Sequence, residues 1–136
     1  MGQNSKTVEA FYAAMGRGDI PFVIGILDPQ IVWKEAENFV YADKSPYVGV
    51  DAVLTGLFAR LGGEWDGFSA VPSEIVDGGE TVAALGRYGG VYKATGVKVD
   101  AQFTHVFRFK DGKVASFQQY TDTAQFKEAV SRRAGA

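Results

Sequence analysis

The sequence predicts an α+β domain in which helices pack on one face of a curved antiparallel sheet. Two observations lead to this fold class: apolar residues recur at helical spacing in the first half of the chain, and they alternate with polar residues in the second half. Helices followed by strands that short, glycine-containing turns connect are typical of an α+β fold. The length fits a single domain, which we expect to span residues 1–136.

Three helices are expected in the first half. The apolar stripe of the first helix has the spacing i, i+3, i+4, i+7 and consists of Val8, Phe11, Tyr12 and Met15. Asp19 is expected to cap the second helix, and the third is expected to run from Asp51 to Gly62–Gly63. Between the last two helices, residues 31–33 are typical of a short strand, and residues 37–48 lack a consistent period and indicate a loop.

Four strands are expected in the second half, and a short final helix is expected to begin at Asp122 or Thr123. The expected strands cover residues 68–76, 80–92, 97–110 and 113–121. The third of these strands has the clearest alternation, with apolar residues at its odd positions from Val97 to Phe109. His105, the only histidine of the chain, lies on that apolar face. Such an imidazole is either a hydrogen-bonded core group or part of a functional pocket.

The turn at Asp111–Gly112 determines which residues share the face of His105. A two-residue turn pairs His105 with Gln118 and places Asp122 on the same face. A three-residue turn with a glycine bulge reverses the parity and turns inward Phe117, Gln119 and Thr121.

With the two-residue turn, a polar cluster forms on an otherwise apolar face, and it consists of Tyr88, His105, Gln118, Tyr120 and Asp122. An acid and an imidazole in apolar surroundings exchange protons near pH 7, although Asp122 is equally suited to cap the last helix. Gly86 and Gly90 share this face if a four-residue turn at 93–96 joins the strands. Because glycines remove bulk, we expect a cavity of several hundred Å³ beside His105.

Composition argues against several classes of function. The net charge of −2 gives no basic surface for nucleic acid, and no apolar run approaches the ~20 residues that span a bilayer. Without cysteine and with one histidine, the chain has no thiolate chemistry and a poor ligand set for zinc. We expect no metal, no cofactor and no nucleic-acid or membrane partner. The N-terminus lacks the apolar core of a signal peptide, so a cytoplasmic protein is expected.

Short motifs are spread over nearly the whole chain, and they are Val8–Tyr12 with Gly18–Asp19, Leu27–Pro29 with Ile31–Trp33, Gly49–Asp51, Tyr92–Gly96 and His105–Phe109 with Asp111–Val114. Together they resemble the SnoaL-like and ketosteroid isomerase-like branch of the nuclear transport factor two-like superfamily. The resemblance implies a cone-shaped sheet wrapped on N-terminal helices, a cystatin-like α+β barrel. Such folds host isomerases, cyclases, hydrolases, dehydratases and binding domains, so the resemblance alone does not define an activity.

The resemblance also implies roles for individual residues. Tyr12 matches the tyrosine that ketosteroid isomerases use as an oxyanion donor, and His105 stands where they place a protonated aspartic acid. Their aspartate base falls near Lys34, with Glu35 as the nearest carboxylate, which argues against steroid isomerisation. In the polyketide cyclase branch, the acid–base aspartate lies nine residues after the lysine of the Asp-Gly-Lys turn, and that position is Asp122 here.

The sequence therefore predicts a domain that binds a small apolar molecule, with cofactor-free general acid–base catalysis by His105 and Asp122. The residues expected to shape its pocket are Tyr12, Trp33, Tyr88, Gln118 and Tyr120. The alternative is a non-catalytic ligand-binding or protein-interaction domain in which His105 and Asp122 only satisfy each other. A homodimer is also expected, because the sheet face away from the helices carries apolar residues such as Leu85 and Val106, and because such domains commonly pair sheet to sheet.

Overall fold

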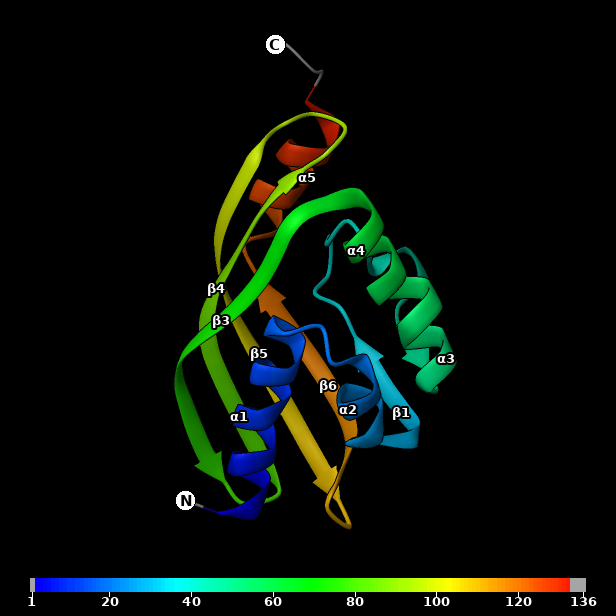
Figure 1. The fold of residues 1–136 in the computed structure, drawn as a ribbon, viewed down its shortest axis with the longest axis vertical. Coiled ribbons are helices and arrows are strands. Elements are labelled where there is room, and N and C mark those ends of the chain that lie inside the picture. Colours follow the sequence, from blue (N-terminus) through cyan, green and yellow to red (C-terminus); the bar gives the residue numbers. More distant parts are fainter. Residues whose placement is uncertain (1, 133–136) are drawn as a thin grey trace.

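The computed structural model describes residues 2–132 of the chain. Helices cover one face of a long, curved sheet, and the last helix packs beside the end of the hairpin that β4 and β5 form (Figure 1). In chain order the elements are α1 (Gln3–Gly16), α2 (Ile20–Gly25), β1 (Leu27–Lys34), η1 (Ala42–Lys44), β2 (Tyr47–Val48), α3 (Val50–Val53), η2 (Leu54–Phe58), α4 (Ala59–Glu64), β3 (Trp65–Gly78), β4 (Thr81–Tyr92), β5 (Lys98–Lys110), β6 (Lys113–Thr121) and α5 (Thr123–Ser131). The predicted α+β class is confirmed.

The strands form one sheet in the order β2-β1-β6-β5-β4-β3. The prediction of a fully antiparallel sheet is wrong for one pair, because β1 and β6 run parallel, with Trp33 opposite Phe117. Parallel neighbours need a long connection between them. Here the whole stretch from residue 35 to residue 112 supplies it, so the sheet is mixed.

The helices begin and end close to the predicted positions. Asp19 caps α2, since its Oδ1 accepts a hydrogen bond from the Phe22 amide at 3.2 Å. Ser5 lies within α1 and is buried. The third predicted helix is continuous over α3, η2 and α4, and its middle turn, η2, is a π-helix. π-Helical turns are rare and are frequent at functional sites.

The β5–β6 hairpin combines features of both registers that the sequence left open. The turn has two residues, with Lys110 opposite Lys113 and positive φ angles at Asp111 and Gly112. A bulge then follows, because Phe109 pairs with Val114 while Arg108 pairs with Ser116. This one extra residue reverses the parity of the rest of β6. As a result, Gln119 lies opposite His105, and the predicted pairing of His105 with Gln118 is wrong.

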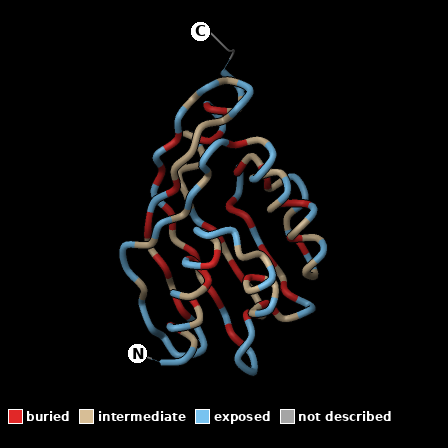
Figure 2. Tube along the Cα trace, viewed as in Figure 1, coloured by how far each residue is buried: buried red, intermediate tan, exposed pale blue. Residues whose placement is uncertain are grey.

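Burial follows this register. The odd positions of β5 from Val99 to Phe109 are buried, and in β6 the buried residues are Val114, Phe117 and Gln119. Buried segments of the strands alternate with exposed ones along the chain trace (Figure 2). The core therefore lies between the helices and the inner face of the sheet.

Candidate functional site

A small cavity lies between the helices and the sheet. Its volume is about 40 Å³, which holds a few water molecules and is smaller than the sequence suggested. The fully buried residues of its lining are Phe11, Tyr12, Trp33, Glu35, Phe39, Leu57, Tyr88, His105, Phe117 and Gln119. Aromatic side chains therefore fill most of the space beneath α1.

The predicted role of Gly86 and Gly90 in making room is wrong. A Cβ atom at Gly86 would collide with the carbonyl oxygen of Val71 and would lie 2.8 Å from the Phe103 ring. At Gly90, which has a φ of 146°, a Cβ atom would lie 3.1 Å from Cα of Phe68. These glycines let β3 approach β4 closely at its bulges.

The cavity faces solvent through residues that are only partly buried. They come from the end of α1, from the η2–α4 helix and from β3, and they are Met15, Phe58, Leu61, Phe68 and Ala70. All of these side chains are apolar. A ligand larger than a few water molecules would have to displace them to enter.

His105 connects two tyrosines on the polar wall of this cavity. Its Nδ1 lies 2.6 Å from the Tyr12 hydroxyl, and its Nε2 lies 2.5 Å from the Tyr88 hydroxyl. The imidazole stacks on Phe103 with ring centres 4.1 Å apart. Burial lowers the pKa of His105 to about 3, so the ring is neutral at pH 7. Tyr88 and His105, which the sequence placed in one polar cluster, thus meet Tyr12, which the sequence placed on the apolar stripe of the first helix.

Gln119 extends this chain of hydrogen bonds to the backbone. Its Nε2 donates to the Tyr88 hydroxyl at 2.9 Å, and its Oε1 accepts from the Ala36 amide at 3.1 Å. The Gln119 residue is only 3% exposed. Gln119 was expected to face inward only in the register with a three-residue turn, because nothing in the local sequence reveals the bulge.

Glu35 is the acidic residue of the cavity. It is 7% exposed, and its Oε1 accepts a long hydrogen bond of 3.4 Å from the Trp33 indole. Its Oε2 is buried and has no hydrogen-bond partner among residues 2–132. Burial raises the pKa of Glu35 to about 8, and the Trp33 N–H only partly offsets this effect.

Glu35 was not among the predicted site residues. The signal was present, since Ile31, Trp33 and Glu35 are alternate residues and all three are buried. The expected strand ended at Trp33, two residues too early to include the carboxyl group. Trp33 itself lines the cavity and stacks on Phe117, with ring centres 3.7 Å apart.

Three predicted site residues lie outside the cavity lining. The prediction that Asp122 shares the face of His105 is wrong, because the bulge reverses the parity of β6. Asp122 precedes α5 without capping it, and its Oδ2 accepts from Gln125 at 3.0 Å. Gln118 and Tyr120 point away from His105 for the same reason, and Tyr120 is 57% exposed.

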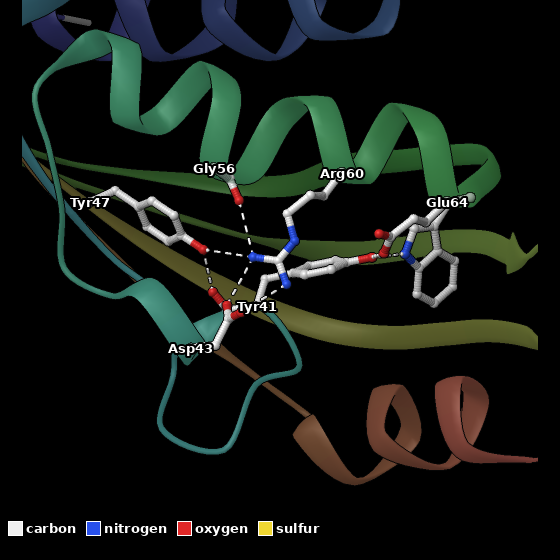
Figure 3. Close-up of polar contacts among 7 residues, drawn as sticks. Tyr41, Asp43, Tyr47, Gly56, Arg60 and Glu64 are labelled. Carbon is white, nitrogen blue, oxygen red and sulfur yellow. Dashed lines mark hydrogen bonds and ion pairs between the residues drawn. The ribbon is translucent and has the colours of Figure 1, made fainter.

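A second polar cluster fixes the helix that forms one wall of the cavity (Figure 3). Arg60 of α4 pairs with both carboxylate oxygens of Asp43 at 2.9 and 3.1 Å, and its guanidinium lies 4.4 Å above the Tyr41 ring. The Tyr41 hydroxyl donates to Glu64 and accepts from the Trp65 indole at 2.9 Å. The loop before β2 is thereby tied to the helix whose other side chains enter the cavity.

The described part of the chain contains no group of three His, Cys, Asp or Glu side chains placed to hold a metal ion. Within the same residues, none of the helices has both the length and the apolar composition that crossing a membrane requires.

Comparisons with known proteins show to which family this chain belongs. Residues 8–117 match the SnoaL-like domain family. A crystal structure of an NTF2-like protein from Burkholderia thailandensis is 34% identical, with a TM-score of 0.91 over 97% of this chain and 100% of that one. An NTF2-like protein of unknown function from Burkholderia pseudomallei is 26% identical, with a TM-score of 0.88 over 97% and 100% of the chains.

A more distant structure, TerC co-crystallized with polyporic acid, is 21% identical and shares the fold, with a TM-score of 0.82 over 96% of this chain and 100% of that one. The search of curated proteins gave no match. The family match covers most of the chain, and its fold is the helix-covered, curved sheet described above. The chain is therefore a member of the SnoaL-like family, within the NTF2-like superfamily that its sequence motifs resemble.

Proposed function

We propose that the cavity binds a small, uncharged and largely apolar molecule, and that Glu35 acts there as a general acid–base. The observation that carries this proposal is the buried Oε2 of Glu35, which has no partner in the described chain although the residue lines the cavity. An unpaired buried polar atom costs stability, and such atoms persist where function requires them.

The raised pKa suits Glu35 to proton transfer near neutral pH. A general base works best when its pKa is close to the working pH, and Glu35, with a pKa of about 8, meets that condition. The carboxylate would take a proton from a carbon next to a carbonyl group, and the resulting acid would return the proton to another atom of the same molecule. This sequence of two transfers is an isomerisation or a cyclisation, and its atoms balance without a co-reactant.

The lining favours an uncharged ligand. Among the residues that the structure describes, no Lys or Arg lines the cavity, and its surface is mostly aromatic and aliphatic. An anionic ligand would lose its hydration there without gaining a cation. His105 has both ring nitrogens occupied by tyrosines, so we assign it an indirect role through Tyr12. Polyporic acid in the TerC crystal supports an organic ligand for this fold.

Proton exchange with a carbon acid tests the catalytic proposal directly. Acetophenone in D₂O serves as the probe, and NMR follows the loss of its methyl protons. We expect exchange that increases with pH up to about 8 and that falls roughly 100-fold or more in Glu35→Gln. Glu37→Gln is the matched control, because Glu37 is exposed two residues further along. Equal exchange by Glu35→Gln and the wild type would contradict the assignment of Glu35.

The alternative is a non-catalytic ligand-binding domain. In that case acetophenone perturbs the NMR signals of cavity residues such as His105 and Trp33 but does not exchange its protons with solvent faster than in buffer. The unpartnered oxygen of Glu35 favours the catalytic proposal, since a group that takes up and returns a proton needs an oxygen that no other side chain occupies.

We also propose that the chain forms a homodimer through the outer face of the sheet. A groove of about 700 Å³ lies on this face, and its lining includes Leu85, Arg87, Gln102, Thr104 and Tyr120. Tyr120 is 57% exposed although large aromatic side chains are usually covered. Light scattering at micromolar concentration tests the proposal, and a mass of 14.7 kDa would contradict it.

A further inference from the structure

The buried hydrogen bonds from Ala36 to Tyr12 have a definite direction. The first step is the orientation of the Gln119 amide. A backbone N–H only donates, so the Gln119 atom that faces the Ala36 amide at 3.1 Å is the oxygen. The other end of the side chain, which lies 2.9 Å from the Tyr88 hydroxyl, is therefore the NH₂ group, and it donates to Tyr88.

The second step is the proton of Tyr88. Its oxygen accepts from Gln119, and its remaining hydrogen-bond partner in the described structure is Nε2 of His105 at 2.5 Å. If Nε2 carried a proton, the Tyr88 oxygen would accept twice and its own proton would have no acceptor. Either direction leaves one tyrosine O–H without an acceptor in the described chain. Donation by Tyr88 makes the hydrogen bonds from Gln119 to Tyr12 all run in the same direction, and hydrogen bonds aligned in this way strengthen one another. Tyr88 therefore donates to Nε2.

The third step is the tautomer of His105. A neutral imidazole carries one proton, and with Nε2 as an acceptor this proton is on Nδ1. The Nδ1–H group then donates to the Tyr12 oxygen at 2.6 Å. Because Tyr12 accepts from His105, its own O–H is not used within the described chain, and Tyr12 lines the cavity.

We propose that Gln119 is a positioning residue that, through Tyr88 and His105, makes the Tyr12 hydroxyl a hydrogen-bond donor to the cavity ligand. This inference rests on the proposed ligand-binding function and specifies the ligand class: a neutral molecule with an acceptor such as a carbonyl oxygen. If the hydrogen bonds ran in the opposite direction, the Tyr12 O–H would donate to Nδ1. Tyr12 could then only accept a hydrogen bond from the ligand. The orientation of the Gln119 amide, three hydrogen bonds away from the Tyr12 oxygen, thus determines whether Tyr12 donates to the ligand or accepts from it.

The tautomer is measured directly by long-range ¹H–¹⁵N NMR, because His105 gives the only histidine signals of the chain. In the free wild-type protein we expect the ¹⁵N shift of a protonated nitrogen at Nδ1 and of an unprotonated one at Nε2. Protonation at Nε2 would overturn the proposal. This arm uses the wild-type chain without a ligand, so it is independent of whether any variant folds or any reaction occurs.

Two variants test the role of Gln119. Gln119→Leu removes the donor to Tyr88, and we expect the preference for Nδ1–H to be lost, with both tautomers contributing to the shifts. Gln118→Leu is the matched control, because Gln118 is the half-buried neighbour that points away from His105, and it should keep the wild-type shifts. An unchanged tautomer in Gln119→Leu would show that Gln119 is not the positioning residue.

The ligand class is tested with two molecules of nearly equal shape, acetophenone and α-methylstyrene, in which a CH₂ group replaces the carbonyl oxygen. One added hydrogen bond predicts about tenfold tighter binding of acetophenone, and Tyr12→Phe should abolish the difference. Equal binding of both molecules by the wild type would overturn the donor role of Tyr12. If neither molecule binds while Nδ1 carries the proton, the proposed ligand-binding function fails. The direction of the hydrogen bonds from Gln119 to Tyr12 is then still supported.

Discussion

The two polar clusters of this domain contain similar side chains but differ in their chemistry. Around the partly exposed Arg60, two tyrosines and two carboxylates gather, and the guanidinium lowers the pKa of Asp43 by hydrogen bonding and charge. Around Glu35, a carboxyl group and two tyrosines lie in the core with no Lys or Arg of residues 2–132 in the cavity lining, and burial raises the pKa of Glu35 to about 8. A nearby cation keeps a carboxylate ionised and unreactive, whereas an apolar cavity poises it for proton transfer.

The largest expected effect is on the pH dependence of stability. The pKa of Glu35 is raised from 4.5 to about 8 by folding, so its contribution is favourable below pH 4.5 and is lost as the pH rises through 8. The loss is on the order of 4 kcal/mol. Glu35→Gln should remove this decline, as urea unfolding at pH 5 and pH 9 would show. An equal decline in both proteins would mean that Glu35 is ionised at no cost.

His105 has the opposite effect to Glu35 on the pH dependence of stability. Its pKa is lowered from 6.5 to about 3, so its contribution to stability is complete above pH 6.5 and is lost as the pH falls toward 3. At neutral pH, His105→Phe leaves the hydroxyls of Tyr12 and Tyr88 without their shared partner. We expect it to lower the free energy of unfolding by about 2–4 kcal/mol. Adding Tyr12→Phe to this variant should recover part of the loss, and no recovery would indicate a packing effect alone.

A smaller effect on the free energy of unfolding is expected at the second polar cluster, around Arg60. Arg60→Met removes a forked ion pair and the contact with the Tyr41 ring, which together contribute about 1 kcal/mol at a partly exposed site. Arg87→Met is the control, because the Arg87–Asp100 pair is 58% and 67% exposed at its side chains and should contribute little. Urea unfolding compares the two variants, and equal losses would show that the Arg60 cluster does not fix the helix.

The smallest effect is expected at Asp122. Asp122→Asn should change the free energy of unfolding by less than about 0.5 kcal/mol, because the side chain bonds only to Gln125 at the surface of the described fold. It should also leave the NMR signals of His105 unchanged. A shift of those signals would restore the coupling of His105 and Asp122 that the sequence suggested.

The sequence predicted most of the fold because its strongest patterns are local. The alternation of β5, the stripe of α1 and the cap at Asp19 each depend on a few neighbouring residues, and the structure contains all three. The bulge after Val114 was not predictable in this way. It depends on how β6 pairs with both β5 and β1, and one extra residue exchanges Gln118 for Gln119 at the site.

The carboxyl group of the site was missed for a related reason. Glu35 follows the last residue of β1, where a charged side chain usually marks the surface. Its burial is imposed by distant residues, since Ala36 is held by Gln119 and the Trp33 ring packs against Phe117. The alternation of Ile31, Trp33 and Glu35 agrees with this burial, but the local sequence does not show which distant residues cover the end of the strand.

The central claim is that the fold holds Glu35 as a carboxyl group of raised pKa inside an apolar cavity. A titration of side-chain carboxyl ¹³C signals measures this pKa directly, and Glu35→Gln identifies the signal by its absence. A midpoint of about 8 is expected for this signal. A midpoint near 4.5, the ordinary value for a glutamate, would contradict the claim and remove the basis for acid–base catalysis at this site.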